Sequence, residues 1–407
     1  MTDMTTDATE ASRLRNHTID QLRDEGWITC PEVEAVMRRV PRDRFTPPGT
    51  PLNEVYDPWK AVITKTSEHG VQTSSVSAPQ IQAFMLEQAQ VRPGMSVLEI
   101  GSGGLNAAYL AELVGREGSV TTVDIDAEVT ERAERLLAAN GYDHVRVVTA
   151  DAAEPIPGLG SVDVILVTVG AWDIPPAWTR QLNPEGRLVV PLRMRGLTRS
   201  VAFVLDGDHL ESESVKACGF VPMQGTTAHQ EQLLLVAGTE EIGLRFDDGL
   251  PIEPSRLNDA VTTRRIETWT GVTIGRQEPL ATLQMHLAIT VPGFCIMSVD
   301  EDKNSGIVAP NNPGFSLAAV ADDSFAYLVH RPAGDMDVEY GVHALGHHAQ
   351  QLADEVTESL RDWDAHRRGG PIPIIRVYPA DTPDDQIAAE RVINKVHSRI
   401  SLSWPAV

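Results

Sequence analysis

A glycine-rich turn, EIGSGG at Glu99–Gly104, leads from a short apolar segment into a helical pattern. Glycines at such a position let the main chain approach a bound ligand closely. The turn lacks the third glycine of the dinucleotide-binding fingerprint and has Leu105 and Asn106 there instead. Dehydrogenases and several other nucleotide-binding proteins carry similar turns. The turn alone therefore predicts a nucleotide-like ligand without selecting its class.

Three carboxylates accompany this turn and narrow the choice of ligand. Glu99 begins the turn, and Asp124 and Asp151 follow the next two apolar segments along the chain. In a parallel sheet these positions meet at one edge, so Asp124 can accept hydrogen bonds from two ribose hydroxyls and Asp151 one from an adenine amino group. Several carboxylates favour a cationic sulfonium over a pyrophosphate. The alternative is that Asp124 and Asp151 only cap the helices that follow.

A run of serines precedes the turn, in the segment SSVSAPQIQAFMLEQ at Ser74–Gln88. Pro79 suits the first turn of an amphipathic helix. From the residues alone, Ser75 or Ser77 is interpreted as the N-cap of that helix. No part of the sequence resembles the nucleophile motif of a serine hydrolase.

The serine segment, placed directly ahead of the glycine turn, resembles the signature (Q/A)-T-I-S-(A/Q)-P of the protein-L-isoaspartate O-methyltransferase family. Other segments resemble motifs of that family in the same order: MRRVPRDRF, VYDPWKAVITK, EIGSGG, VDVILVTVGAWDIPPAW and LNPEGRLVVPL. The likeness covers roughly residues 15–225, through GFVPMQG. It implies S-adenosylmethionine as the cofactor and a carboxylate side chain of a peptide or protein as the methyl acceptor.

The resemblance also implies roles for particular residues. Ser77 matches the serine that contacts the acceptor carboxylate in this family, and we expect it to orient that group rather than to act as a nucleophile. Substrate contacts are expected at Ser74, Ala78 and Gln82. Cofactor contacts are expected at Ser75, Val76, Glu99, Gly101, Ser102, Gly103, Asn106, Asp124, Ile125, Asp151 and Ala152.

Two departures from the family pattern lie at positions that are expected to recognise the substrate. Ser74-Ser75 replaces the common Gln-Thr, and Gln80-Ile81-Gln82 replaces a segment that often bears His or Tyr. The combination of SSVSAP, EIGSGGLNAA, VTVGAWDIPPAW, PLRMRGLTRS and FDDGLP is most similar to the lanthipeptide-associated, FxLD-system methyltransferases. That resemblance implies a ribosomally made precursor peptide, in which an aspartate is methylated and then rearranged through a succinimide to isoaspartate. General isoaspartate repair and a non-catalytic peptide-binding module are the alternatives.

Alternating strands and helices must position these residues. Helical patterns follow the glycine turn at Leu105–Val114 and follow Asp126 as far as Asn140. Continuously apolar segments predict strands at Ser96–Ile100, Val120–Ile125, Val145–Ala150, Val162–Val169 and Arg187–Leu192. This alternation predicts an α/β fold with a Rossmann-like parallel sheet. A helical pattern also covers residues 17–44 with a break at Pro41, and residues 47–73 are expected to form an irregular loop.

The chain of 407 residues is long enough for two domains. We expect a disordered tail at residues 1–15, a catalytic domain at 16–229, and a C-terminal α+β domain at 230–407 for substrate recognition or dimerisation. Within the C-terminal domain, strands are predicted at 231–237, 283–290, 324–330 and 372–378, and helices at 343–368 and 386–400.

Three histidines of the C-terminal part, His343, His347 and His348, have a metal-like spacing on the predicted helix. No cysteine or fourth ligand is close in sequence, so surface histidines are favoured and no metal is expected. Trp363 and Trp404 are candidates for gripping a peptide, although packing in the core is favoured for both.

The composition excludes several classes of protein. A net charge of −23 disfavours nucleic acid as a partner. No apolar run approaches the length of a membrane span, and the polar N-terminus lacks the features of a secretory signal. Cys30, Cys218 and Cys295 lie far apart, which is typical of a reducing compartment. We therefore expect a soluble, cytoplasmic protein that acts on a peptide or protein, binds neither nucleic acid nor membranes, and is compatible with a homodimer.

Overall fold

The structure is a computed structural model that describes residues 2–68 and 70–405. The chain divides into two compact units, each described by itself below. The first unit contains Met1–Leu192, Thr198–His229 and Val396–Ser398, and the second contains Arg193–Leu197, Gln230–Lys395 and Arg399–Val407. The main change of unit follows residue 229, where the sequence places a domain boundary. Residues 193–197 belong to the second unit and residues 396–398 to the first, and no sequence pattern indicated either assignment.

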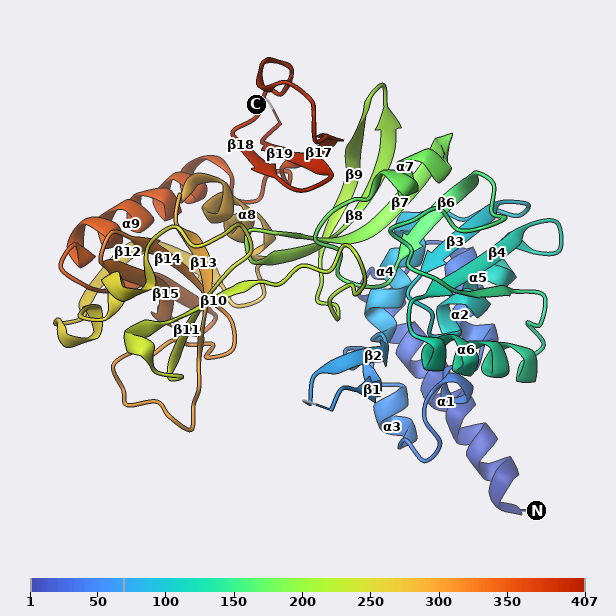
Figure 1. Ribbon diagram of the computed structural model, residues 1–407. Helices are drawn as coiled ribbons and strands as arrows, with labels where there is room; N and C mark the ends of the chain where they lie inside the picture. The colour runs from blue at the N-terminus through green and yellow to red at the C-terminus, as the bar shows by residue number, and fades with distance from the viewer. Residues whose placement is uncertain (1, 69, 406–407) are drawn as a thin grey trace. The chain divides into compact units, whose positions relative to one another are not determined.

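Five parallel strands form the centre of the first unit (Figure 1). In spatial order they are β5 (Arg146–Thr149), β4 (Ser119–Asp124), β3 (Ser96–Ile100), β6 (Val162–Val167) and β7 (Leu182–Met194). The order continues with an antiparallel pair, β8 (Leu197–Asp206) and β9 (His209–Ala217). The predicted Rossmann-like α/β fold is confirmed.

Four helices of the first unit connect or cover these strands: α4 (Pro79–Ala89), α5 (Leu105–Val114), α6 (Ala127–Ala139) and α7 (Pro176–Gln181). Helix α5 is buried along almost its whole length, and Glu112 is the residue of this helix that is not buried. Helix α6 is amphipathic, and the Asp126 side chain caps it by accepting a 3.0 Å hydrogen bond from the main-chain N–H of Glu128. The glycine turn joins β3 to α5, so it lies at the carboxyl edge of the sheet, as predicted.

The N-terminal residues form a helix, so the prediction of a disordered tail at 1–15 is wrong. Helix α1 covers Thr2–Asp24, and its Ile19 and Leu22 are buried in the core of the first unit. The residues before Ile19 are mostly polar, and such a composition is shared by solvated tails and by the outer face of a surface helix.

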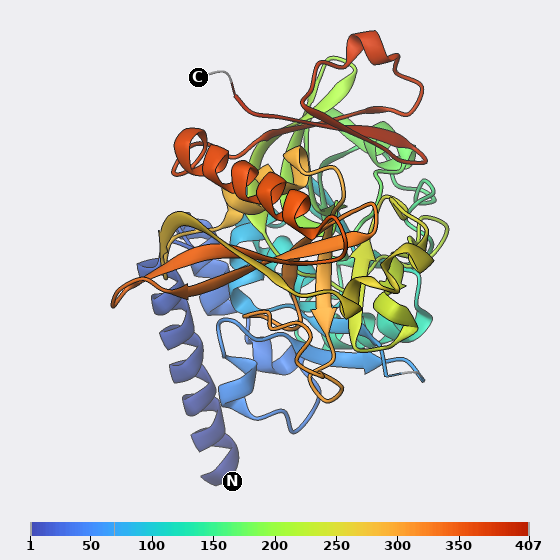
Figure 2. The same cartoon turned by 90° about the vertical axis from the view of Figure 1, so that its left-hand side faces the viewer.

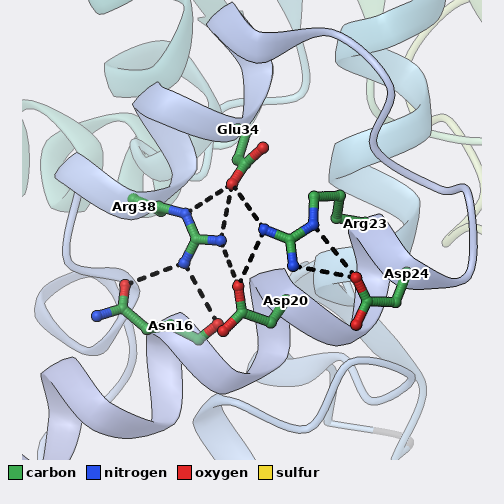
Figure 3. Close-up of polar contacts among 6 residues, drawn as sticks. All are labelled: Asn16, Asp20, Arg23, Asp24, Glu34 and Arg38. Carbon is green, nitrogen blue, oxygen red and sulfur yellow. Dashed lines mark hydrogen bonds and ion pairs between the residues drawn. The ribbon is translucent and has the colours of Figure 1, made fainter.

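Charged side chains join α1 to α2, which covers Pro31–Arg39 (Figure 3). The Arg38 guanidinium lies 2.6 Å from Asp20 and 2.8 Å from Glu34. Arg23 reaches the same Glu34 carboxylate at 3.4 Å. One carboxylate shared by two arginines orients the two helices, although exposed pairs of this kind add little stability individually.

Regular structure also lies within residues 47–73, which were predicted to be an irregular loop. A 3-10 helix at Arg42–Phe45 precedes the segment, and α3 covers Leu52–Val55. Strand β1 (Val62–Thr66) then pairs antiparallel with β2 (Gln72–Val76). The polar residues of this two-stranded ribbon show little of the apolar alternation that predicts a strand. The end of β2 carries the serine segment toward α4.

A seven-stranded antiparallel sheet forms the centre of the second unit. In spatial order its strands are β10 (Gln232–Leu235), β11 (Ile242–Phe246), β13 (Phe294–Val299), β14 (Ser316–Ala321), β15 (Ser324–Pro332), β16 (Asp337–Leu345) and β12 (Ile266–Gly275). Helix α9 (Ala349–His366) packs on β12, β15 and β16 (Figure 2). The remaining elements are α8 (Ala281–Thr290), β17 (Ile374–Pro379), β18 (Arg391–Asn394), β19 (Ser398–Ser403) and 3-10 helices at Val236–Gly238, Pro254–Leu257, Ala260–Thr262 and Asp384–Gln386.

Two predicted elements of the second unit are wrong. Residues 283–290, predicted as a strand, lie in α8, because an apolar run without clear periodicity fits a buried helix as well as a strand. Residues 386–400, predicted as a helix, contain β18 and the start of β19, which pair antiparallel. The strands predicted at 231–237, 324–330 and 372–378 are confirmed as β10, β15 and β17.

The helix predicted at 343–368 begins later, at Ala349, so the three histidines do not share it. His343 lies in β16, His347 lies between that strand and the helix, and His348 directly precedes the helix. The metal-like spacing was therefore a product of the wrong helix boundary.

Trp363 and Trp404 are both buried, which confirms that they are core residues rather than exposed aromatic contacts. Within the described part of the chain, no helix combines the length and the apolar character needed to cross a membrane.

Candidate functional site

The glycine turn adopts a conformation that requires glycine. Gly101 has φ +97°, and a Cβ atom there would lie 2.6 Å from Thr168 Oγ1. The Thr168 hydroxyl donates a 2.6 Å hydrogen bond to the carbonyl of Gly101, and the N–H of Gly101 donates to the carbonyl of Val123. These contacts hold the turn against the ends of β4 and β6 and leave its other side open to a ligand.

Asp124, at the end of β4, binds the turn from the neighbouring strand. Its Oδ2 accepts a 3.0 Å hydrogen bond from the main-chain N–H of Ser102. Its Oδ1 accepts a 2.9 Å hydrogen bond from the main-chain N–H of Asp126. Burial raises the pKa of Asp124. The cap of α6 is Asp126, so the interpretation of Asp124 as a mere helix cap is not supported. Each Asp124 oxygen retains a lone pair for a further donor.

Glu99 is the most deeply buried acid of the site. Its Oε2 accepts a 2.6 Å hydrogen bond from Thr122, and the Asn106 side chain also favours its charged form. The nearby Ser102 hydroxyl has no hydrogen-bond partner among the described residues. Burial raises the pKa of Glu99 to about 7. Buried polar atoms without a partner are uncommon in native proteins, and here they line a cavity that a polar ligand would fill.

These groups share one cavity, which we call the first cavity, with about 640 Å³ of partly open space. It brings together eleven of the predicted site residues: Ser74, Ser75, Val76, Ser77, Gln82, Glu99, Gly101, Ser102, Gly103, Asn106 and Asp124. The lining also includes Ile81, Met85, Thr168, Val169, Phe220 and Val221. The predicted residues therefore converge from β2, α4, β3, α5 and β4.

Asp151 lines an adjoining second cavity, together with Ile125 and Ala152. Its Oδ2 accepts hydrogen bonds from the N–H and the hydroxyl of Thr226, at 2.8 and 3.0 Å, and its Oδ1 accepts one from the N–H of Ala153. Burial opposes the charged form of Asp151, but these hydrogen bonds hold its pKa below the usual value. Asp151 thus anchors the segment around Thr226, in addition to the adenine contact predicted for it.

Ser77 lies between β2 and α4, half-buried in the first cavity. The residue directly before α4 is Ala78, and among the residues that the structure describes no side chain caps this helix. The interpretation of Ser75 or Ser77 as an N-cap is therefore wrong. Ser74, a predicted substrate contact, accepts a 2.9 Å hydrogen bond from Thr64 and is buried.

A groove of about 1250 Å³, widely open to solvent, adjoins the first cavity in the first unit. Ser75, Ser77, Ile81, Phe220 and Val221 line both spaces, and Ala78 lines the groove. The groove also contains the exposed apolar side chains of Trp59 and Val71, which are 49% and 55% accessible. Exposed apolar groups beside a cavity are typical of a surface that binds a partner or ligand.

Comparison with known proteins identifies the family. The family model described as protein-L-isoaspartate(D-aspartate) O-methyltransferase matches residues 12–228, more than half of the chain. The chain belongs to this family. The protein-L-isoaspartate O-methyltransferase of Hyperthermus butylicus is 36% identical over 227 residues, covering 53% of this chain and 91% of the relative. That of Methanopyrus kandleri is 34% identical over 223 residues, covering 54% of this chain and 95% of the relative.

A solved protein-L-isoaspartate O-methyltransferase has a similar fold over most of the chain. It is 19% identical, with a TM-score of 0.51, and the match covers 96% of this chain and 100% of that structure. The match extends beyond the family region into the second unit. That solved structure therefore also has residues that match the C-terminal part of this chain.

The chain is an S-adenosylmethionine-dependent O-methyltransferase. The first cavity fits this cofactor: its carboxylates suit a sulfonium, and the buried Ser102 hydroxyl has no hydrogen-bond partner in the described part of the chain. Gly103 leaves open space beside the main chain, where a Cβ atom would have only Ser75 O within 4.0 Å. Asp124 is positioned at the same cavity with lone pairs available.

Sequence reasoning missed several residues of the site. Thr168 and Val169 belong to VTVGAWDIPPAW, and Phe220 and Val221 to GFVPMQG; both segments were quoted for the family, but no site role was assigned to them. Their distance along the chain from the glycine turn concealed the contact.

Proposed function

We propose that this enzyme methylates an aspartate side chain of a ribosomally made, lanthipeptide-type precursor peptide, which leads through a succinimide to isoaspartate. The observation that carries the proposal is the junction of the first cavity and the groove at Ser77. A cofactor in the cavity and a peptide in the groove would meet at this residue. The meeting point is a hydroxyl, which suits a carboxylate acceptor.

Bound S-adenosylmethionine supplies an electrophilic methyl group on a sulfonium. An acceptor carboxylate is already ionised at neutral pH, so the enzyme needs no general base to activate it. The Ser77 hydroxyl donates a hydrogen bond to one carboxylate oxygen and orients the other for in-line attack. Apolar residues such as Met85 and Phe220 exclude water from the cavity, which favours a reaction in which opposite charges disappear.

The later steps follow from the chemistry of the product. The methyl ester of aspartate is an electrophile, and the main-chain nitrogen of the next residue in the peptide attacks its carbonyl carbon. Methanol leaves, and a succinimide ring remains. Water then opens the ring at either carbonyl, which gives aspartate or isoaspartate, and this step requires no residue of the enzyme.

The proposed peptide substrate is supported by the residues that line the first cavity where the methyl acceptor is proposed to bind. Ser74, Ser75 and Gln82 stand where the family pattern has other residues, and all three line the first cavity. The groove with Trp59 and Val71 offers apolar contacts for residues flanking the acceptor. We assign the second unit a role in substrate recognition or dimerisation, and the cell compartment is proposed to be the cytoplasm.

Repair of isoaspartyl residues in damaged proteins is the second candidate. The named relatives favour it, since they are protein-L-isoaspartate O-methyltransferases. The solved structure that covers 96% of this chain shows that additional length does not by itself select peptide maturation. A non-catalytic peptide-binding module is disfavoured by the intact cavity around Glu99, Asp124 and Ser77.

An assay with methyl-labelled S-adenosylmethionine tests the proposed reaction. The substrate is a thioether-cyclised peptide that contains one aspartate, and a peptide with asparagine in its place is the control. We expect label to enter the aspartyl peptide as a base-labile ester and to be released later as methanol, with isoaspartate in the product. Stable label, or equal labelling of the asparagine control, would contradict carboxyl methylation.

A further inference from the structure

Arg42 is a buried cation for which no described carboxylate lies within ion-pair distance. Its side chain belongs to the 3-10 helix at Arg42–Phe45 and is only 2% exposed. The guanidinium donates to three neutral oxygens: the carbonyl of Val55 at 2.7 Å, the carbonyl of Val76 at 3.3 Å and Gln82 Oε1 at 2.7 Å. Burial lowers the pKa of Arg42 to about 10, which still leaves it charged at neutral pH.

The contact with Arg42 determines how the Gln82 amide is oriented. A guanidinium carries only donors, so the amide must present its oxygen to Arg42. The amide nitrogen is therefore available to the first cavity, which Gln82 lines together with Ser77. Arg42 also binds the carbonyl of Val76, the residue directly before Ser77. One buried cation thus positions both sides of the place where the acceptor is proposed to bind.

We infer that Arg42 and Gln82 form a relay that binds the acceptor carboxylate. The Gln82 amide nitrogen donates to the carboxylate, beside the Ser77 hydroxyl, and Arg42 is a positioning residue that polarises this amide. A buried charge with only neutral partners is costly, and an incoming anion offsets that cost. The inference rests on the proposed function, because it takes the cavity at Ser77 to be the acceptor site.

The relay also solves an electrostatic problem of the first cavity. Glu99 and Asp124 line the same cavity and oppose the entry of another anion. A direct ion pair with an arginine would attract the carboxylate but would also hold electron density that the methyl transfer needs. The neutral Gln82 amide, placed between Arg42 and the acceptor carboxylate, attracts the carboxylate without forming an ion pair with it. After methylation the ester has no charge, so the relay no longer favours it and product release is promoted.

The isosteric variant Gln82→Glu gives the sharpest test. The new carboxylate would pair with Arg42, which protects the fold, but it removes the donor and repels the acceptor. We expect KM for the peptide to rise by about tenfold to a hundredfold, with kcat changed much less. S-adenosylhomocysteine affinity and the melting temperature should be maintained. Gln82→His should restore most of the affinity, because a neutral imidazole can accept from Arg42 and donate to the substrate.

Gln88→Glu is the matched control on the same helix. Gln88 is also buried, bonds to Ser200 and Ser214, and does not line the first cavity. Gln88→Glu should lower the melting temperature without raising KM, the reverse of Gln82→Glu. The probes are the cyclised aspartyl peptide and a linear isoaspartyl peptide.

Four outcomes would count against the relay. An unchanged KM in Gln82→Glu, or a loss confined to cofactor affinity, would overturn this inference alone. Failure of Gln82→His to recover affinity would overturn the donor role of residue 82. If the wild-type enzyme methylated neither peptide, the acceptor assignment and the relay would both be rejected.

Discussion

The main-chain N–H of Ser102 donates a 3.0 Å hydrogen bond to the Asp124 carboxylate, and this contact ties the glycine turn to the end of the neighbouring strand. Asp124 also lines the first cavity, so its carboxylate has two roles when a cofactor binds. It can accept hydrogen bonds from ribose hydroxyls, and it holds the turn in the shape that the cofactor contacts. Asp124 therefore joins the local structure of the turn to the affinity for the cofactor.

Asp124→Ala should weaken the binding of S-adenosylmethionine and S-adenosylhomocysteine. Each hydrogen bond to a charged acceptor contributes about 1.5–3 kcal/mol, so a loss of roughly tenfold to a hundredfold or more is expected. Titration calorimetry measures it. Asp126→Ala is the matched control, since it removes the cap of α6 and should lower stability rather than cofactor affinity. Undiminished binding by Asp124→Ala would reject the assigned role.

Ser77→Ala should slow methyl transfer while leaving cofactor affinity and the melting temperature nearly unchanged. Ser77 does not cap α4, so its hydroxyl is not needed for that helix to form. Loss of a hydrogen bond to a charged carboxylate predicts a decrease in kcat/KM of about tenfold to a hundredfold. Single-turnover assays, with S-adenosylhomocysteine binding measured in parallel, distinguish the outcomes. A matching loss of cofactor affinity would instead indicate a structural role.

Glu99 should make stability depend on pH. Its pKa is about 7 in the folded chain and near the ordinary value of 4.5 when unfolded. Between these values the unfolded chain has released this proton while the folded chain retains it, so the free energy of unfolding falls as pH rises. The expected decrease is about 3 kcal/mol between pH 4.5 and 7.

Glu99→Gln should remove this part of the pH dependence. Urea unfolding of both proteins, without cofactor and across that pH range, gives the difference directly, and other titrating groups cancel. Parallel pH profiles for the wild type and the variant would show that the Glu99 carboxyl has no raised pKa in the folded protein.

Asp173 should be needed for the stability of the first unit. It is buried and accepts hydrogen bonds from the N–H of His397, at 2.7 Å, and from the hydroxyl of Ser398, at 2.5 Å. Asp173→Ala would leave these donors without their acceptor, so we expect a loss of about 2–5 kcal/mol in the free energy of unfolding. Ser398→Ala removes one donor only and should cost less. Equal stability of Asp173→Ala and wild type would exclude this role.

The parts of the fold that could be predicted have strong local signals. The segment from Ser96 to Val114 has an apolar strand, a glycine turn and a helix closed by Gly115, and the structure reproduces it. The strand predicted at 283–290 failed because a helix that is apolar on every side has no polar face to reveal it. The helix predicted at 386–400 failed because this segment forms a local antiparallel hairpin of β18 and β19, in which Asn394 pairs with Arg399. A short run of mixed apolar and polar residues does not distinguish a strand from a helix.

The site shows the same division. Glu99, Asp124 and Asp151 could be located because each stands at the end of an apolar strand, and the fold brings such ends together. The burial of Arg42 could not be predicted, since it depends on the carbonyls of Val55 and Val76 enclosing a charge. The resemblance to the family supplied the acceptor role of Ser77, for which residue chemistry alone favoured a helix cap.

The substrate preference is tested most directly by comparing three peptides of one sequence: cyclised with aspartate, linear with aspartate, and linear with isoaspartate. A ring presents the carboxylate in one geometry and lowers the entropy lost on binding. With the full-length enzyme, kcat/KM should be highest for the cyclised aspartyl peptide, by about tenfold or more over the linear isoaspartyl peptide. Highest turnover of the linear isoaspartyl peptide, with no gain from the ring, would contradict peptide maturation and leave isoaspartate repair as the function.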